Sequence, residues 1–194
     1  MKLSMRSVLV LMLTVLPFGA SWAEDAEAKY AETITVFKNA GESGSYFNKS
    51  YGYAVFPTVG KAGLVVGGAY GEGRVYEGGK YVGDTSVSQL SVGFQAGGQA
   101  YSQIVFFQDK RSFLEFTSGN FEFGAQASAV AITAGASAGT STTGSSAGSS
   151  GGKHDATTVG GGYYKGMAVF TVAKGGLMYE ASVSGQKFSY TPKK

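Results

Sequence analysis

The glycine-rich segment from Lys61 to Gly83, KAGLVVGGAYGEGRVYEGGKYVG, has the composition of a loop that could wrap a phosphate group. A phosphate loop of the type G-x-x-x-x-G-K-[ST] needs a lysine directly after its second glycine, so that the ammonium group reaches over the phosphates. Gly73 and Gly78 have this spacing, but Gly79 stands where the lysine is required. The dinucleotide-binding pattern G-x-G-x-x-G also fails, because Tyr76 occupies the place of its third glycine. We therefore predict that Gly78 and Gly79 form the two-residue turn of a β-hairpin.

Two stretches match the serine hydrolase motif G-x-S-x-G: GASAG at 135–139 and GSSAG at 144–148. That motif needs a strand before it, a helix after it, and an acid followed by a histidine later in the chain. Here both matches lie in a tract of Gly, Ala, Ser and Thr, and the single histidine, His154, precedes Asp155. One histidine and no cysteine exclude a His-rich zinc site and a thiol nucleophile. A carboxylate pair for glycoside hydrolysis is neither favoured nor excluded. We predict a protein that is not an enzyme and uses no cofactor.

The first 23 residues have the features of a secretory signal peptide. Lys2 and Arg6 precede an apolar run at 8–18 that is too short to span a bilayer, and small residues follow it up to Ala23. We expect cleavage after Ala23 and a periplasmic or secreted product. Because the chain has no cysteine, it offers no lipidated cysteine as an anchor and no disulfide bond.

The charge of the mature chain is close to zero. Removal of the leader leaves 14 basic residues against 13 acidic ones, a net charge of +1 in place of +3. A nucleic acid partner normally requires a strongly basic face, so we predict no nucleic acid binding. The segment 24–42 is acidic, whereas the end of the chain from Lys153 is basic.

Residues 25–38 predict an amphipathic helix, because Ala26, Tyr30, Ile34 and Phe37 recur at helical spacing. Its polar face is acidic, which favours docking of the apolar face on the core of the domain over a position at a lipid surface.

The rest of the mature chain predicts a β-rich α+β fold. Short runs of strand-forming residues begin at Tyr53 and are interrupted by glycine after four to six residues. We expect antiparallel strands in a barrel- or sandwich-like core, with the N-terminal helix and a short helix near 109–118 that Gly119 ends. The Gly/Ser/Ala tract at about 134–152 predicts a flexible loop within one domain that spans 24–194.

One short pattern occurs twice in the sequence. YAVFPTVGKAGL at 53–64 resembles MAVFTVAKGGL at 167–177, with a one-residue gap in the connection. Lys61 and Lys174 take the same place in the two copies. The repeat has two interpretations: a duplicated hairpin, or two independent solutions to the same turn.

Successive blocks of the sequence resemble the SYLF domain family, which is also described as a Ysc84-type actin-binding domain. The blocks are YAVFPTVGKAGLVVGGAYGEGRVY, SVGFQAGGQAYSQIVFF, FLEF, FGAQASAVA and KGGLMYEASVSGQKF. The resemblance extends over about residues 30–192. It implies a β-rich domain that binds phosphoinositides or acidic phospholipids without catalysis. Eukaryotic members use a basic N-terminal segment at membranes, whereas the corresponding segment here is acidic.

The resemblance and the repeated pattern together suggest a surface for anionic lipid head groups. We expect Lys61 and Lys174 to supply its charge, assisted by Arg74, Lys80 and Lys165. The alternative for these residues is that they are solvated lysines at turns. At the level of the whole protein, the alternatives are a small outer-membrane β-barrel and an envelope scaffold that binds a polymer through exposed tyrosines.

Overall fold

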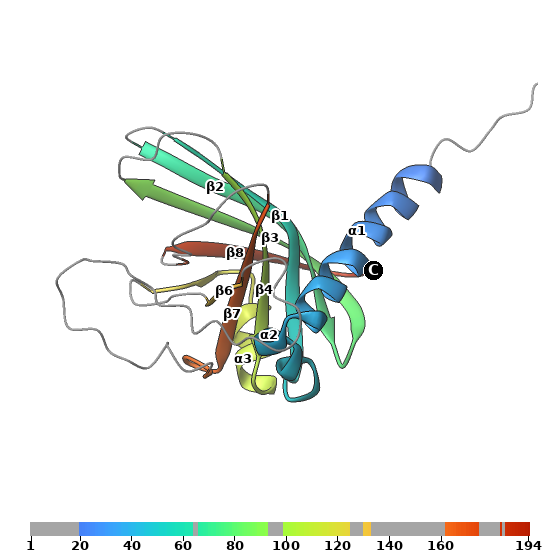
Figure 1. Cartoon of the computed structure of the whole chain (residues 1–194). Coiled ribbons are helices and arrows are strands. Elements are labelled where there is room, and N and C mark those ends of the chain that lie inside the picture. Colours follow the sequence, from blue (N-terminus) through green and yellow to red (C-terminus); the bar gives the residue numbers. More distant parts are fainter. Residues whose placement is uncertain are drawn as a thin grey trace, which may run out of the picture.

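The computed structural model describes residues 20–63, 66–92, 99–124, 130–132, 162–174, 183 and 185–194. Within these residues the chain forms one curled eight-stranded sheet (Figure 1). The long N-terminal helix crosses one face of the sheet, and the shorter helices lie at one of its ends. The prediction of a β-rich, largely antiparallel fold with an N-terminal helix is therefore confirmed. The two G-x-S-x-G motifs, the predicted loop at 134–152 and the leader up to residue 19 lie outside the described residues.

The helices are α1 (Ala20–Asn39), α2 (Gly41–Gly44), η1 (Ser45–Asn48) and α3 (Lys110–Phe116). Helix α1 contains the predicted helix 25–38, and α3 is the predicted short helix. The side chain of Asp109 caps α3 by accepting a hydrogen bond from the Ser112 N–H at 2.8 Å. Among the described residues, no helix is both long enough and apolar enough to cross a bilayer.

The strands are β1 (Gly52–Gly63), β2 (Val66–Glu77), β3 (Lys80–Val92), β4 (Gln99–Phe107), β5 (Phe121–Glu122), β6 (Val130–Ile132), β7 (Met167–Lys174) and β8 (Gln186–Pro192). Their order in the sheet is β5-β8-β3-β2-β1-β4-β7-β6. All neighbours are antiparallel except β6 and β7, which are parallel.

The expectation of short strands is wrong for β1, β2 and β3, which have 12, 12 and 13 residues. Pro57 does not end β1, because the pairing of β1 shifts register between Val55 and Thr58 and the bulge accommodates a residue without an N–H group. The predicted turn is confirmed: Gly78 and Gly79 have φ angles of +54° and +81°, and they join β2 to β3.

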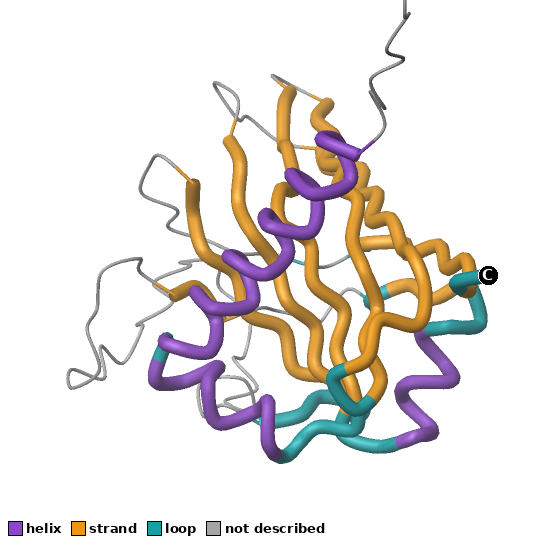
Figure 2. Tube along the Cα trace, turned by 90° about the vertical axis from the view of Figure 1, so that its right-hand side faces the viewer, coloured by secondary structure: helices purple, strands orange, loops and turns teal. Residues whose placement is uncertain are grey.

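The sheet buries side chains on both of its faces. Helix α1 crosses one face, which we call the outer face (Figure 2). Phe37 of this helix packs there with Tyr53, Ile104 and Phe170. The opposite, inner face packs Phe56, Phe107 and Phe188 against Phe116 of α3. The N-terminal helix thus docks on a core, as its spacing predicted.

The inner face is concave, and an amide pair shows how strongly the sheet curls. Gln103 of β4 and Gln186 of β8 are separated by three strands in the sheet order, yet the Gln103 Nε2 donates to the Gln186 Oε1 at 2.9 Å. The Gln186 Nε2 donates in return to the Gln103 Oε1 at 3.1 Å and to the hydroxyl of Tyr101 at 3.1 Å. Both glutamine side chains are fully buried, so this polar contact holds two distant strands together across the interior.

The packing explains why the segment that resembled a phosphate loop is rich in glycine. A Cβ atom at Gly73 would lie 2.5 Å from the Phe56 ring and 2.8 Å from the carbonyl oxygen of Val55. The glycine therefore lets a buried aromatic ring lie against the backbone of the neighbouring strand.

Substitution of Gly73 by Ala is expected to destabilise the fold by about 2 kcal/mol, because overpacking forces the ring or the backbone to move. Gly60 provides the matched control, since a Cβ at that strand position meets no atom within 4 Å. We expect Gly60→Ala to be neutral or slightly stabilising. Urea unfolding of both variants measures the difference, and equal stabilities would contradict the packing role of Gly73.

Candidate functional site

Two large apolar side chains stand exposed on the outer face at one end of the sheet. We call the end where β1 finishes and β2 begins the distal end, and the end with the Gly78–Gly79 turn and α3 the proximal end. Leu90 of β3 is 85% exposed and Tyr70 of β2 is 58% exposed. Leu90 lies opposite Gly68, and Tyr70 lies opposite Ser88 and Gly60, so small residues surround both. The distal end therefore presents an apolar projection that the described helices leave uncovered.

Lys61 and Lys174 both lie at this distal end, but on opposite faces of the sheet. Lys61 pairs with Gln99 of β4, and Lys174 pairs with the next residue, Ala100. Neighbouring positions along a strand point to opposite faces. Lys61 follows Val59 of the inner core by two residues and shares its face, whereas the Lys174 ammonium donates to the Thr58 hydroxyl at 3.1 Å on the outer face.

The repeated sequence pattern corresponds to two strands, β1 and β7, that flank β4. Their registers differ by one residue: Phe56 pairs with Gln103, whereas Phe170 pairs with Ile104. A shift of one residue moves a side chain to the other face of a sheet. The two copies therefore share a strand conformation and a position along the sheet. They do not place Lys61 and Lys174 side by side.

Arg74 fastens α1 to the sheet and is 16% exposed. Its guanidinium lies 4.4 Å from the ring centre of Tyr30 on α1 and 4.7 Å from that of Tyr81 on β3, and it donates to the Glu27 Oε2 at 3.0 Å. Burial lowers the pKa of Arg74, but its hydrogen bonds to Glu27 and Tyr76 outweigh this effect and hold the pKa above its ordinary value. A lipid head group could bind the Arg74 guanidinium only by displacing these contacts with Tyr30, Tyr81 and Glu27.

Lys80 and Lys165 lie at the proximal end, away from Lys61 and Lys174. Lys80 is exposed and follows the Gly78–Gly79 turn, and Lys165 is exposed in the turn that precedes β7. Of the five predicted residues, the structure therefore brings Lys61 and Lys174 to the distal end, and Lys80 and Lys165 to the opposite, proximal end. The sequence did not predict that Leu90 and Tyr70 are exposed. Alternation of apolar and polar residues predicts the face that a strand residue occupies, but it does not predict how far a helix covers that face.

A group of buried, uncharged polar side chains lies in the described interior beneath the distal end. Tyr101 lies beside the Gln103 and Gln186 pair, and burial raises its pKa to about 12 despite the hydrogen bond from Gln186. At neutral pH this phenol is protonated. Thr171, which pairs with Gln103 in the sheet, is also buried there.

The sequence model of the family Ysc84, described as Las17-binding protein actin regulator, matches residues 88–193. The chain belongs to this family. The resemblance to SYLF domains that the sequence blocks predicted is thereby confirmed. The Ysc84 match contains Leu90, Lys174 and both glutamines of the buried pair, whereas Lys61 and Tyr70 precede it.

A curated relative is beta cell expansion factor A of Aeromonas veronii, a SYLF-family protein. It is 29% identical over 159 residues, which make up 80% of this chain and 51% of the relative. The chain thus spans about half the length of the curated relative it matches. Membership of the Ysc84 family assigns the chain to a family of binding domains.

Proposed function

We propose that this domain binds the surface of anionic phospholipid membranes in the cell envelope, weakly and reversibly, through its distal end. The observation that carries the proposal is the exposed pair Leu90 and Tyr70 at the same end as two lysines. Apolar side chains that enter the head-group region and lysines that meet its negative charge are the two contributions that hold peripheral proteins on membranes.

The positions of the lysines suit an end-on approach to the membrane. Lys61 on the inner face and Lys174 on the outer face would both lie near the lipid surface if the strand ends point toward it. Glu72 reduces the positive charge on the outer face, where it accepts a hydrogen bond from the Tyr70 hydroxyl at 3.3 Å. The net attraction is therefore small and depends on the apolar contact as well.

The expected affinity follows from these few groups. A lysine near an anionic surface contributes about 1 kcal/mol, and full burial of a leucine contributes about 1.5–3 kcal/mol. Such a sum holds the domain reversibly, and salt weakens its electrostatic part. Neither contribution requires catalysis or a cofactor.

Co-sedimentation with vesicles tests the proposal. We expect the protein to sediment with phosphatidylglycerol or cardiolipin vesicles at low salt, to be largely released at high salt, and to bind phosphatidylcholine vesicles poorly. Absence of binding to every anionic vesicle would refute the lipid assignment. Export of the chain belongs to the same proposal, and mass spectrometry of the exported protein checks it by an N-terminus at Glu24.

A further inference from the structure

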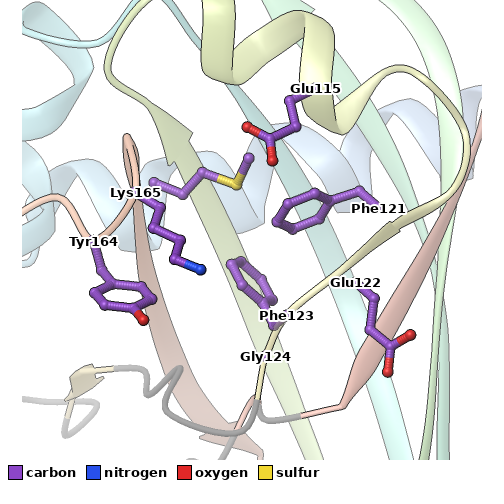
Figure 3. Close-up of a pocket in the computed structure, with 8 residues that line it drawn as sticks. Glu115, Phe121, Glu122, Phe123, Gly124, Tyr164 and Lys165 are labelled. Carbon is purple, nitrogen blue, oxygen red and sulfur yellow. The ribbon is translucent and has the colours of Figure 1, made fainter.

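A small hollow lies at the proximal end, where the turn before β7 approaches α3, β5 and the two residues that follow β5 (Figure 3). Its volume is about 70 Å³, and its apolar wall consists of Phe121, Phe123, Tyr164 and Met167. Roughly 10–15 Å³ of such space holds one water molecule, so the hollow has room for about five to seven small groups.

Among the charged groups around the hollow, one positive charge has no ion-pair partner in the described residues. Glu115 pairs with Arg111 at 3.6 Å, and Glu122 pairs with Lys187 at 3.5 Å. Lys165 also lines the hollow; among the described residues it forms no ion pair, and its ammonium lies 5.7 Å from the ring centre of Tyr164. Figure 3 shows its side chain directed toward Phe123, whereas the carboxylate of Glu122 points away from the hollow. The unpaired charge in this aromatic hollow is therefore cationic.

The backbone of Lys165 is in an unfavourable conformation for a lysine. Its φ angle is +51°, and no other described residue except glycine has a positive φ. Lys165 and Gly166, with φ of +81°, form a two-residue turn that the Tyr164 N–H and the Met167 N–H close with hydrogen bonds of 2.8 and 3.0 Å. Asn, Asp or Gly is preferred at the first position of such a turn. A lysine held there in a strained conformation is typical of a position with a functional demand.

We propose that this hollow binds a small organic monoanion, namely a carboxylate on a short apolar body. The carboxylate pairs with the Lys165 ammonium, and the apolar body lies against Phe121, Phe123 and Met167. Two carboxylates at the rim, Glu115 and Glu122, disfavour a doubly charged anion such as a phosphate monoester. Butyrate, with six non-hydrogen atoms, is a suitable probe. The hollow lies at the opposite end of the sheet from the proposed membrane surface, so this site does not depend on lipid binding.

Titration of the purified protein with sodium butyrate, followed by amide NMR, tests the proposal. We expect saturable shifts at residues around the hollow. Butyramide has the same number of non-hydrogen atoms as butyrate but no charge, and butylammonium has one fewer and a positive charge. Both are expected to give no saturable shifts there. Equal responses to butyrate and butyramide, or shifts that do not saturate with butyrate, would overturn the proposal.

Two variants of Lys165 separate its charge from its strain. Lys165→Asn is expected to weaken butyrate binding at least tenfold and to raise the Tm by about 2–4 °C, because asparagine tolerates the left-handed turn. Lys165→Gln is expected to weaken binding equally without this gain in Tm. Lys80→Asn, which changes an exposed lysine outside the hollow, leaves butyrate binding unchanged. Wild-type butyrate affinity in either Lys165 variant would exclude the site, while vesicle binding of these variants reports separately on the membrane surface.

Discussion

Replacement of Gln186 by Ala is expected to lower the free energy of unfolding by about 3 kcal/mol. The substitution removes both hydrogen bonds to Gln103 and the one to the Tyr101 hydroxyl. Each buried polar group left without a partner costs about 1–3 kcal/mol, and the truncated side chain adds a cavity. Urea unfolding followed by circular dichroism measures the loss.

A double variant shows that the loss comes from unpaired amides. Replacing Gln103 and Gln186 together by Leu removes both amides, so the double variant is expected to be more stable than Gln186→Ala. Gln99→Ala, at an exposed position of the same strand as Gln103, is the control and should change stability by less than about 0.5 kcal/mol. A cost below about 1 kcal/mol for Gln186→Ala would contradict the idea that this pair fastens β4 to β8.

Loss of the charges or of the leucine at the distal end is expected to weaken vesicle binding strongly. Lys61→Gln combined with Lys174→Gln removes about 2 kcal/mol of attraction, which corresponds to a roughly 30-fold weaker affinity for phosphatidylglycerol vesicles. Leu90→Ser removes an apolar contribution of about 1.5–3 kcal/mol and should weaken binding at least tenfold. Only the lysine variant is expected to reduce the salt dependence.

Matched substitutions at the proximal end are the controls for the loss of charge and for the loss of the leucine. Lys49→Gln with Lys110→Gln removes the same number of charges, and Leu114→Ser removes a leucine that is 55% exposed on α3. These variants should bind anionic vesicles within about twofold of the wild type. If they weaken binding as much as the distal variants, the orientation that we propose is wrong.

The sequence predicted the elements with strong local signals. The spacing of Tyr30, Ile34 and Phe37 is that of a helix with one buried side, and consecutive glycines at 78 and 79 adopt the positive φ angles of a tight hairpin turn. Asp109 and Gly119 lie at the two ends of α3 and its following turn, where capping and left-handed residues are expected. Each of these signals lies within a few residues of the structure that it specifies.

The candidate site required information that lies far apart in the sequence. Lys61 and Lys174 have the same local sequence, but the pairing of each strand with β4 decides which face each side chain occupies. The glycine-rich hairpin sequence predicts that Arg74 is available for a ligand, but Tyr30 and Glu27 on α1 enclose its side chain. Leu90 is exposed because α1 does not cover that part of β3. None of these relations follows from periodicity.

The orientation of the domain on the membrane is the central claim, and a single tryptophan placed at Leu90 tests it most directly. Trp22 is the only tryptophan in the chain and lies within the predicted leader, so Leu90→Trp in a mature background that begins at Glu24 reports from one position. On phosphatidylglycerol vesicles we predict that its emission shifts to shorter wavelength and becomes protected from iodide, whereas Leu114→Trp in the same background stays accessible and unshifted. An unchanged spectrum at position 90 on vesicles that bind the protein, or an equal shift at position 114, would contradict the account.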